Sequence, residues 1–388
     1  MWFLICICRY VEGSTKEATR RSRDKGVSRV YTLGSITRLP PQKLILTVTK
    51  NKMQLIDLIV ADLTAHKTDF QTHTLVIVGS DPVPVEIMKG CVCKRHDLTT
   101  THEEADTIII QQVARVETGT VLVIADDTDI FVLLLHFCHL GNISCNVLMV
   151  SPIQGRAVLD INASVEKHRA VLPDLLAGHC LSGCDTVASH FGIGKGIALK
   201  VLRSATYRLD LLGNTGDQVQ LSNIVEQATQ FMLACYGQSS CKSMTEARKK
   251  LWSSKVGRSN ASAPKLCSLP PTTEAFAENV ARAHLQLAIW KSALEPTPPV
   301  LDPTAHGWSL KEGSTTLSPT AVPPETPLAP LDLLKLIRCS CQSQAPCKTQ
   351  KCSCSSANIP CTLFCVCQGG HECQNERNKD VENAEDDD

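Results

Sequence analysis

Nine cysteines in a short C-terminal segment are the residues whose type and spacing point most directly to chemistry. Between Cys339 and Cys373, six of the nine form three C-x-C pairs, and a single cysteine follows each pair. Zinc in structural sites takes four tetrahedral ligands, so this spacing brings several sulfurs within reach of one ion. The predicted zinc ligands are Cys339, Cys341, Cys347, Cys352, Cys354, Cys361, Cys365, Cys367 and Cys373.

Sharing of sulfurs explains how nine cysteines can satisfy zinc ions that each need four ligands. Three ions need twelve bonds, which six terminal and three bridging thiolates supply. A segment this short with almost no apolar residues needs such a metal core in order to fold. A disulfide knot is the alternative. The odd number of cysteines and the lack of a recognisable secretory leader favour zinc in a reducing compartment.

Basic residues flank the C-x-C pairs in Arg338-Cys-Ser-Cys341 and Lys351-Cys-Ser-Cys354, and Cys365-Val-Cys367 completes the pattern. The segment resembles a tesmin-type CXC domain, which also occurs in the male-specific-lethal ubiquitin ligase. The resemblance implies three zinc ions held by nine cysteines, and contact with DNA. Arg338, Lys348 and Lys351 are therefore candidate phosphate contacts, although solubility explains these charges equally well.

Acidic side chains recur at three places where an α/β fold would form a ligand site. Glu104 and Asp106 open an expected helix, and Asp127 and Asp129 follow an apolar run. Asp185 comes shortly after a glycine. The carboxyl ends of parallel strands form the ligand crevice of a sheet, and acids spaced two apart in an extended chain face the same way. Clustered carboxylates repel one another unless cations neutralise them, which predicts Mg²⁺ or Mn²⁺. Helix caps and turns are the alternative explanation of each motif alone.

A glycine-rich hairpin follows the last acidic motif. Gly192-Ile193-Gly194-Lys195 leads to Ala198 and opens an expected helix. Free backbone amides and the positive end of a helix dipole can hold a DNA phosphate at such a position. An ordinary glycine turn is the alternative.

The order of these motifs resembles that of the flap endonuclease and xeroderma pigmentosum group G nuclease superfamily, which has a PIN-like fold. The resemblance covers about residues 9 to 205 and implies metal-dependent cleavage of DNA. The implied catalytic metal ligands are Glu104, Asp127, Asp129 and Asp185. The implied DNA-binding residues, on a basic helix and on the hairpin, are Lys16, Arg20, Arg21, Gly192, Gly194 and Lys195. Cys8 and His102 stand where that family has acidic residues.

Hydrophobic periodicity predicts an α/β fold in which helices flank a parallel sheet. Apolar runs at 74–79, 120–125 and 145–150 suit buried strands, whereas 50–63 and 103–116 have helical spacing. Further helices are expected at 223–235, 245–252 and 273–293. The predicted organisation begins with a basic N-terminal segment at 1–30, which forms the truncated start of the PIN-like domain. The domain itself follows at 31–205, with a helix-hairpin-helix at 191–202, and a helical extension spans 206–294. A proline-rich linker at 295–332, the CXC domain at 333–376 and an acidic tail at 377–388 complete the chain.

Charge and composition narrow the choice of partners. The chain has 39 Lys and Arg against 39 Asp and Glu, and aromatic residues make up 4%. This balance excludes a uniformly basic DNA-coating protein, and the few aromatics argue against stacking platforms for bases. No apolar run approaches the roughly 18 residues of a membrane span. Together with the DNA contact that the resemblance to CXC domains implies, these limits lead us to expect a nuclear protein that contacts DNA through local patches and does not contact membrane.

The combined motifs also resemble those of a group of animal proteins associated with mobile elements. The shared motifs are His102-Glu-Glu-Ala-Asp-Thr107, Asp127-Thr-Asp129, Leu181-Ser-Gly-Cys-Asp-Thr186, Leu269-Pro-Pro-Thr272 and the CXC segment. Two functions fit the sequence. One is a divalent-metal-dependent, structure-selective nuclease, and the other is a catalytically inactive scaffold that binds DNA or chromatin through its CXC segment.

Overall fold

The computed structural model divides into two compact units, Met1–Val322 and Pro323–Asp388, which we describe separately. It describes residues 2–23, 29–79, 81–216, 219–255, 265–310, 313, 315–323, 338–342, 346–357, 359–362, 365–369, 372–376 and 378. The acidic tail predicted at 377–388 therefore lies outside the described residues except for Asn378. Residues 324–332 of the predicted linker lie outside them as well.

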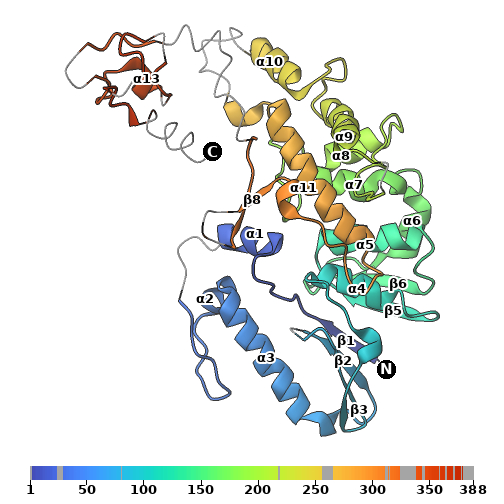
Figure 1. The fold of residues 1–388 in the computed structure, drawn as a ribbon. Coiled ribbons are helices and arrows are strands. Elements are labelled where there is room, and N and C mark those ends of the chain that lie inside the picture. The colour runs from blue at the N-terminus through green and yellow to red at the C-terminus, as the bar shows by residue number, and fades with distance from the viewer. Residues whose placement is uncertain are drawn as a thin grey trace. The chain divides into compact units, whose positions relative to one another are not determined.

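The first sheet of unit 1 has four strands in the order β1-β2-β3-β4 (Figure 1). Its strands are β1 (Trp2–Cys6), β2 (Thr74–Val78), β3 (Val85–Met88) and β4 (Cys91–Lys94). β1 and β2 are parallel, whereas β3 is antiparallel to both β2 and β4. The β3–β4 hairpin turns through Lys89 (φ 50°) and Gly90 (φ 72°), the two left-handed residues that a two-residue primed turn requires.

The second sheet has three strands, β5 (Thr120–Ile124), β6 (Asn146–Val150) and β7 (Leu159–Asp160). β5 and β6 are parallel, and β7 is antiparallel to β6. The α/β class is thus confirmed, and the three apolar runs do form strands. The expectation of one parallel sheet was wrong: the strands belong to two mixed sheets, because short connections after β2 and β6 reverse the chain direction and force antiparallel pairing.

Helices pack against the two sheets. Those of the first 205 residues are α1 (Thr15–Arg23), α2 (Gln42–Thr47), α3 (Thr49–Ala65), α4 (Ala105–Val113), α5 (Thr128–His139), α6 (Ile161–His168), α7 (Leu172–Leu181) and α8 (Lys195–Leu202). α3 covers the first sheet through Val60 and Leu63, which pack against Leu75, Ile77 and Ile87. Short 3-10 turns lie at Lys67–Asp69, His96–Leu98, Leu266–Ser268 and Pro303–Ala305.

The later helices share a core with the α/β elements. They are α9 (Leu221–Cys235), α10 (Met244–Lys255) and α11 (Thr273–Lys291), close to the ranges expected from periodicity. Phe276 and Trp290 of α11 are completely buried in the same apolar cluster as Leu133 of α5 and Leu176 of α7. The predicted extension is therefore an integral layer of unit 1, with α11 lying along α7.

Part of the segment predicted as a proline-rich linker is folded onto unit 1. Residues after α11 form a hairpin of β8 (Trp308–Leu310) and β9 (Leu317–Pro319). Trp308 and Leu317 are buried against Leu285 of α11. The Arg282 guanidinium donates hydrogen bonds to the carbonyls of Gly307 (2.7 Å) and Thr320 (2.8 Å), which fixes the hairpin on the helix.

Unit 2 has little regular structure in its described residues. A single helical turn, α13 (Ser353–Ser356), lies among turns, and the buried core consists of cysteine side chains.

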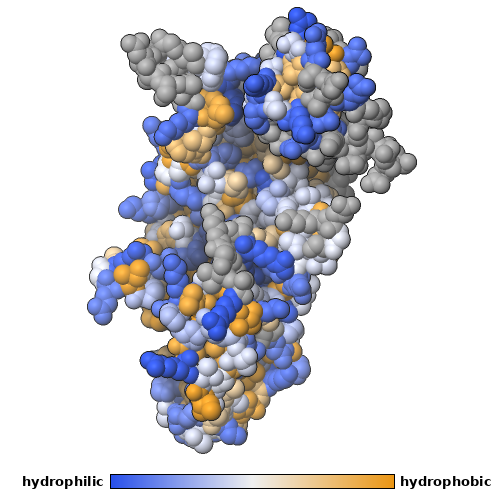
Figure 2. Space-filling model, turned by 90° about the vertical axis from the view of Figure 1, so that its left-hand side faces the viewer, coloured by the Kyte–Doolittle hydropathy of each residue, from blue (hydrophilic) through white to orange (hydrophobic). Residues whose placement is uncertain are grey.

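The face drawn in Figure 2 carries apolar residues in small patches among hydrophilic ones, as is normal for a protein surface. None of the described helices has both the length and the apolar character that crossing a bilayer would demand.

Candidate functional site

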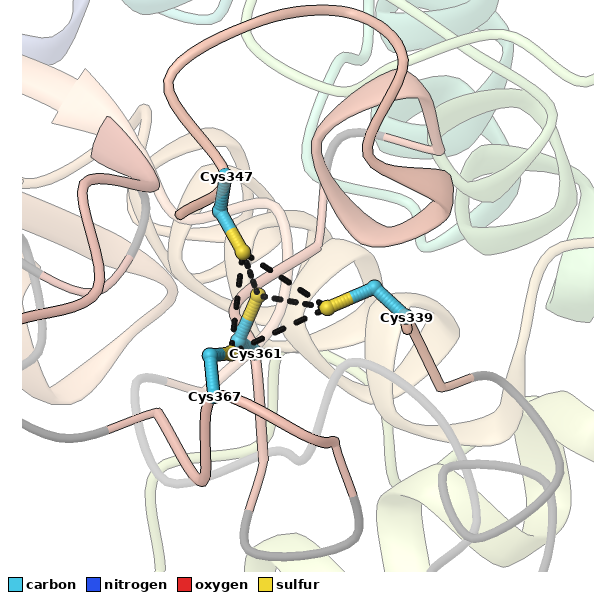
Figure 3. Close-up of side chains that lie close together, drawn as sticks. All are labelled: Cys339, Cys347, Cys361 and Cys367. Carbon is cyan, nitrogen blue, oxygen red and sulfur yellow. Dashed lines mark hydrogen bonds between the residues drawn. The ribbon is translucent and has the colours of Figure 1, made fainter. Parts of the chain in front are cut away.

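The C-terminal cysteines gather into one cluster that can hold metal ions. The sulfurs form three overlapping groups of four, and within each group the sulfur atoms all lie within 4.8 Å of one another. Their members are Cys339, Cys347, Cys361 and Cys367; Cys339, Cys352, Cys354 and Cys361; and Cys339, Cys341, Cys347 and Cys352. Figure 3 shows the first group, in which four side chains from separate turns point toward a common centre. Cys339 belongs to all three groups.

The two remaining cysteines adjoin these groups. Cys365 Sγ lies 3.5 Å from Cys354 Sγ, and Cys373 Sγ lies 3.8 Å from Cys367 Sγ. All 20 cysteines lie in the described residues, and none forms a disulfide. The nine cysteines therefore lie in one cluster, which could hold zinc ions.

Crowding of thiols makes a cation favourable at this place. Burial and the neighbouring sulfur of Cys365 raise the pKa of Cys354 to about 12. Thiolates packed this closely repel one another unless a cation neutralises them, and zinc binding displaces the thiol protons. The donor set therefore fits a soft divalent ion such as zinc.

Backbone and amide contacts hold the cysteine turns together. Cys352 caps α13, with its sulfur 3.5 Å from the Ser355 amide that donates to it. The Asn375 side chain, 1% exposed, donates to the Ile359 carbonyl (2.9 Å) and to Cys361 Sγ (3.4 Å). Asn375 is thus a structural partner of the ligands.

The predicted DNA-contacting residues of unit 2 lie on its surface. Arg338, Lys348 and Lys351 are all exposed, each beside a buried or half-buried cysteine. The Ser353 hydroxyl donates to the Arg338 carbonyl at 3.0 Å, which brings the first and second C-x-C segments together.

In unit 1, Glu104 is the most enclosed of the predicted catalytic acids. It precedes α4 as its N-cap residue and is 5% exposed. Its carboxylate accepts hydrogen bonds from Gln286 Nε2 (2.9 Å) and Trp290 Nε1 (3.1 Å). Both donors come from α11, about 180 residues later in the chain, and neither was expected from the sequence.

Lys16 joins two of the acids. Its ammonium lies 3.2 Å from Glu104 Oε2 and 3.2 Å from Asp185 Oδ2, and the residue is 7% exposed. Burial disfavours the charged ammonium, but attraction to Glu104 and Asp185 outweighs this and raises the pKa of Lys16. The basic helix predicted at the N-terminus thus delivers a cation into the acidic site.

Asp127 and Asp129 lie near the same site but not on an extended segment. Asp127 is the N-cap of α5, where its carboxylate accepts the Asp129 amide (2.9 Å), and Asp129 is in the first turn. The extended geometry expected for the pair was wrong, because the cap begins the helix directly after β5. Asp129 accepts a hydrogen bond from His179 Nε2 of α7 at 2.7 Å, another contact that the sequence did not reveal.

The pKa of Asp106 reflects burial and the charges around it. Burial and then repulsion from Glu104, Asp127 and Asp129 raise its pKa to about 7, although Lys16 acts in the opposite direction. Among the described residues, however, every group of three or more metal-ligating atoms within 4.8 Å consists of cysteines. The acids therefore surround a common region, with the Lys16 ammonium between two of them, without forming a closed cage of oxygens.

The other predicted DNA-binding residues of unit 1 are engaged within the unit. Arg20 pairs with Glu103 (2.7 Å), and Arg21 pairs with Glu17 (2.7 Å) in the same helix. Lys195 donates to the carbonyls of His179 and Gly183.

The glycine hairpin is exposed and sterically open. Gly192 has φ 77°, Gly194 is the N-cap of α8, and a Cβ atom at either position would meet nothing within 4 Å. Ile193 between them is buried and anchors the hairpin. Its backbone is therefore accessible from solvent.

Comparison of the chain with models of protein families, with curated proteins and with solved structures finds no match in any of the three. The geometry of the two sites therefore carries the functional argument.

Proposed function

We propose that this chain is a nuclear, zinc-containing DNA-binding protein. The observation that carries the proposal is the set of three overlapping four-sulfur groups around Cys339. Each group has the four thiolates that one tetrahedral zinc ion needs. The resemblance of the segment to a CXC domain supports the same conclusion.

Three zinc ions would use the nine sulfurs completely. Cys339, Cys347, Cys352 and Cys361 each occur in more than one group, which makes them candidates for bridging positions. The bound ions would neutralise the thiolates and provide the core that the unit otherwise lacks. Unit 2 would then be a rigid support for the exposed charges around it.

Purified full-length protein should contain about three zinc ions when its metal content is measured by mass spectrometry. Cys354→Ser should lower the zinc content, since Cys354 is completely buried in the cluster. Cys267→Ser is the matched control because Cys267 is an exposed cysteine of unit 1. A folded wild-type protein without zinc would reject the proposal.

DNA contact would run through phosphates and be sensitive to salt. Arg338, Lys348 and Lys351 are exposed beside the cluster and can each neutralise one phosphate. Replacement of all three by alanine should weaken binding to every duplex sequence and reduce the salt slope by about three. The control is the triple alanine variant of Lys43, Lys50 and Lys67, three exposed lysines of unit 1. An equal loss in both variants would contradict specific use of unit 2.

A second candidate function belongs to the acidic site, with a PIN-like, flap-endonuclease-like domain around it. The approach of Glu104 and Asp185 to one cation, the Lys16 ammonium at 3.2 Å from each carboxylate, favours it. Glu104, Asp127, Asp129 and Asp185 would hold Mg²⁺ or Mn²⁺, and two such ions about 4 Å apart would polarise a phosphodiester and stabilise its displacement. The exposed hairpin at Gly192 and Gly194 would support the DNA backbone.

Flap and hairpin DNA incubated with the full-length protein in Mn²⁺ tests this function. Cleavage should be abolished in the double variant Asp127→Ala, Asp129→Ala, and retained when Asp62 and Asp69, which lie outside the site, are changed to alanine. Absence of cleavage, or cleavage unaffected by the first variant, would favour the alternative of a catalytically inactive scaffold, derived from a mobile element and bound to chromatin through unit 2.

A further inference from the structure

Helix α11 extends into the acidic site with two side chains one turn apart. Gln286 and Trp290 are separated by four residues and therefore lie on the same face of the helix. Gln286 is 2% exposed and Trp290 is completely buried. Both contact Glu104, which belongs to the start of α4. A helix from the later part of unit 1 thus reaches a predicted catalytic acid.

The Gln286 amide makes two different hydrogen bonds at its two ends. Its Nε2 donates to Glu104 Oε1 (2.9 Å), and its Oε1 accepts from the Thr186 hydroxyl (2.6 Å). A carboxylate only accepts, so the nitrogen end must face Glu104 and the oxygen end must face the hydroxyl. Glutamine is therefore matched to this position, because it carries a donor and an acceptor on one planar group.

Two bridges consequently join the same two segments. Thr186 is the neighbour of Asp185, so the amide of Gln286 connects the Glu104 segment to the Asp185 loop. The Lys16 ammonium connects Glu104 to Asp185 itself, at 3.2 Å from each carboxylate. One bridge is cationic and can be replaced by another cation. The other is a neutral amide that competes with no cation.

We infer that Gln286 and Trp290 are positioning residues of the acidic site, holding the Glu104 carboxylate and the Asp185 loop in register for a divalent cation. The inference rests on the metal-binding part of the proposed function. Apart from any bound cation, the Glu104 carboxylate accepts hydrogen bonds from two neutral donors. Gln286 Nε2 donates to one of its oxygens and Trp290 Nε1 donates to the other. Donors of this kind orient a ligating carboxylate and tune its basicity.

Mn²⁺ binding to the full-length protein, followed by electron paramagnetic resonance of free Mn²⁺, is the first test. Gln286→Met and Trp290→Phe should each weaken Mn²⁺ binding about 10-fold to 100-fold, as loss of a partner behind a metal ligand does. Gln227→Met is the matched control: Gln227 also bridges a donor and an acceptor, Leu211 N (3.1 Å) and Asp210 Oδ1 (2.9 Å), but away from the acids. Thr186→Val removes only one end of the bridge and should have an intermediate effect. Wild-type affinity in both α11 variants would overturn the inference.

A second measurement separates failure of this inference from failure of metal binding itself. The indole N–H resonance of Trp290, assigned among the four tryptophans by its loss in Trp290→Phe, reports the bond to Glu104 without any added metal. It should move in Glu104→Gln and in Gln286→Met, and stay in place in Gln227→Met. If wild type binds no Mn²⁺ but these shifts occur, the metal-dependent function fails while the positioning contacts stand. An indole N–H resonance that keeps its wild-type position in Glu104→Gln and in Gln286→Met would reject the positioning role.

Discussion

Lys16 places one ammonium group between two carboxylates that come from distant parts of the chain. It is 7% exposed, as is expected of a charge that is paired on both sides. Arg21 provides a contrast within the same helix, because its own side chain is 49% exposed although it pairs with Glu17 and donates to Thr316 Oγ1. Breaking the buried Lys16 pairs would leave uncompensated charge away from water and is therefore costly. Breaking the pair of the more exposed Arg21 should change the free energy of unfolding little.

Lys16→Met should therefore destabilise unit 1 by about 3 kcal/mol at neutral pH, since it leaves Glu104 buried without its cation. Arg21→Met should cost less than about 1 kcal/mol, because an exposed pair contributes little. Urea denaturation of the two variants beside wild type measures both values. Equal losses would mean that the Lys16 bridge is not a buried interaction.

Asp106 gives the acidic site a dependence on pH. Its pKa is raised to about 7 by burial and neighbouring acids, above the ordinary value of 3.8, so the folded state favours the protonated form. Stability from this residue is present at low pH and is lost as pH rises through the folded pKa. Asp106→Asn should therefore be more stable than wild type, and its advantage should grow by about 3 kcal/mol from pH 5 to pH 8. Thermal unfolding in buffers without added divalent cation checks the sign. An advantage that shrinks with rising pH would contradict it.

At the scale of elements, local patterns were readable and long-range pairings were not. Helical spacing predicts α3, α9 and α11 to within a few residues, because an amphipathic period is written in neighbouring positions. The cysteine spacing predicts the sulfur cluster because its members lie within one short segment of the chain. Two sheets rather than one could not be foreseen, since the antiparallel pairing of β2 with β3 depends on the short connection between them, which reverses the chain. The bond between Glu104 and Gln286 joins elements about 180 residues apart, and no local pattern encodes it.

The hairpin of β8 and β9 depends on one close approach to α11. Gly307 has φ 77°, and a Cβ atom there would lie 2.4 Å from the Glu278 carbonyl oxygen. Gly307→Ala should destabilise unit 1 by about 3 kcal/mol, through backbone strain together with this clash. Gly141→Ala is the control: Gly141 has φ 75° but open space around it, so only the strain of about 1 kcal/mol remains. Chemical denaturation followed by tryptophan fluorescence compares them, and equal costs would show that the hairpin can move away from α11.

At the scale of the whole molecule, the two units are stabilised by different physical forces. Unit 1 buries a large apolar core that includes Leu133, Phe231 and Trp290, so its folding follows from the hydrophobic effect. In unit 2 the buried cluster of the described residues consists of cysteines, whose thiolates are favourable neighbours only around a cation. Loss of zinc should consequently affect unit 2 and spare unit 1.

Selective chelation of zinc under reducing conditions, with Mg²⁺ kept in excess, should therefore remove one of two unfolding transitions in calorimetry of the full-length protein. The transition of unit 1 should keep its midpoint, because none of its core depends on the cysteine cluster. Limited proteolysis should then cut within residues 338–376 while a fragment ending after Val322 survives, and added zinc should restore both the resistance and the lost transition. A single transition that shifts as a whole on chelation would show instead that the two units fold together and that the sulfur cluster contributes to the stability of both.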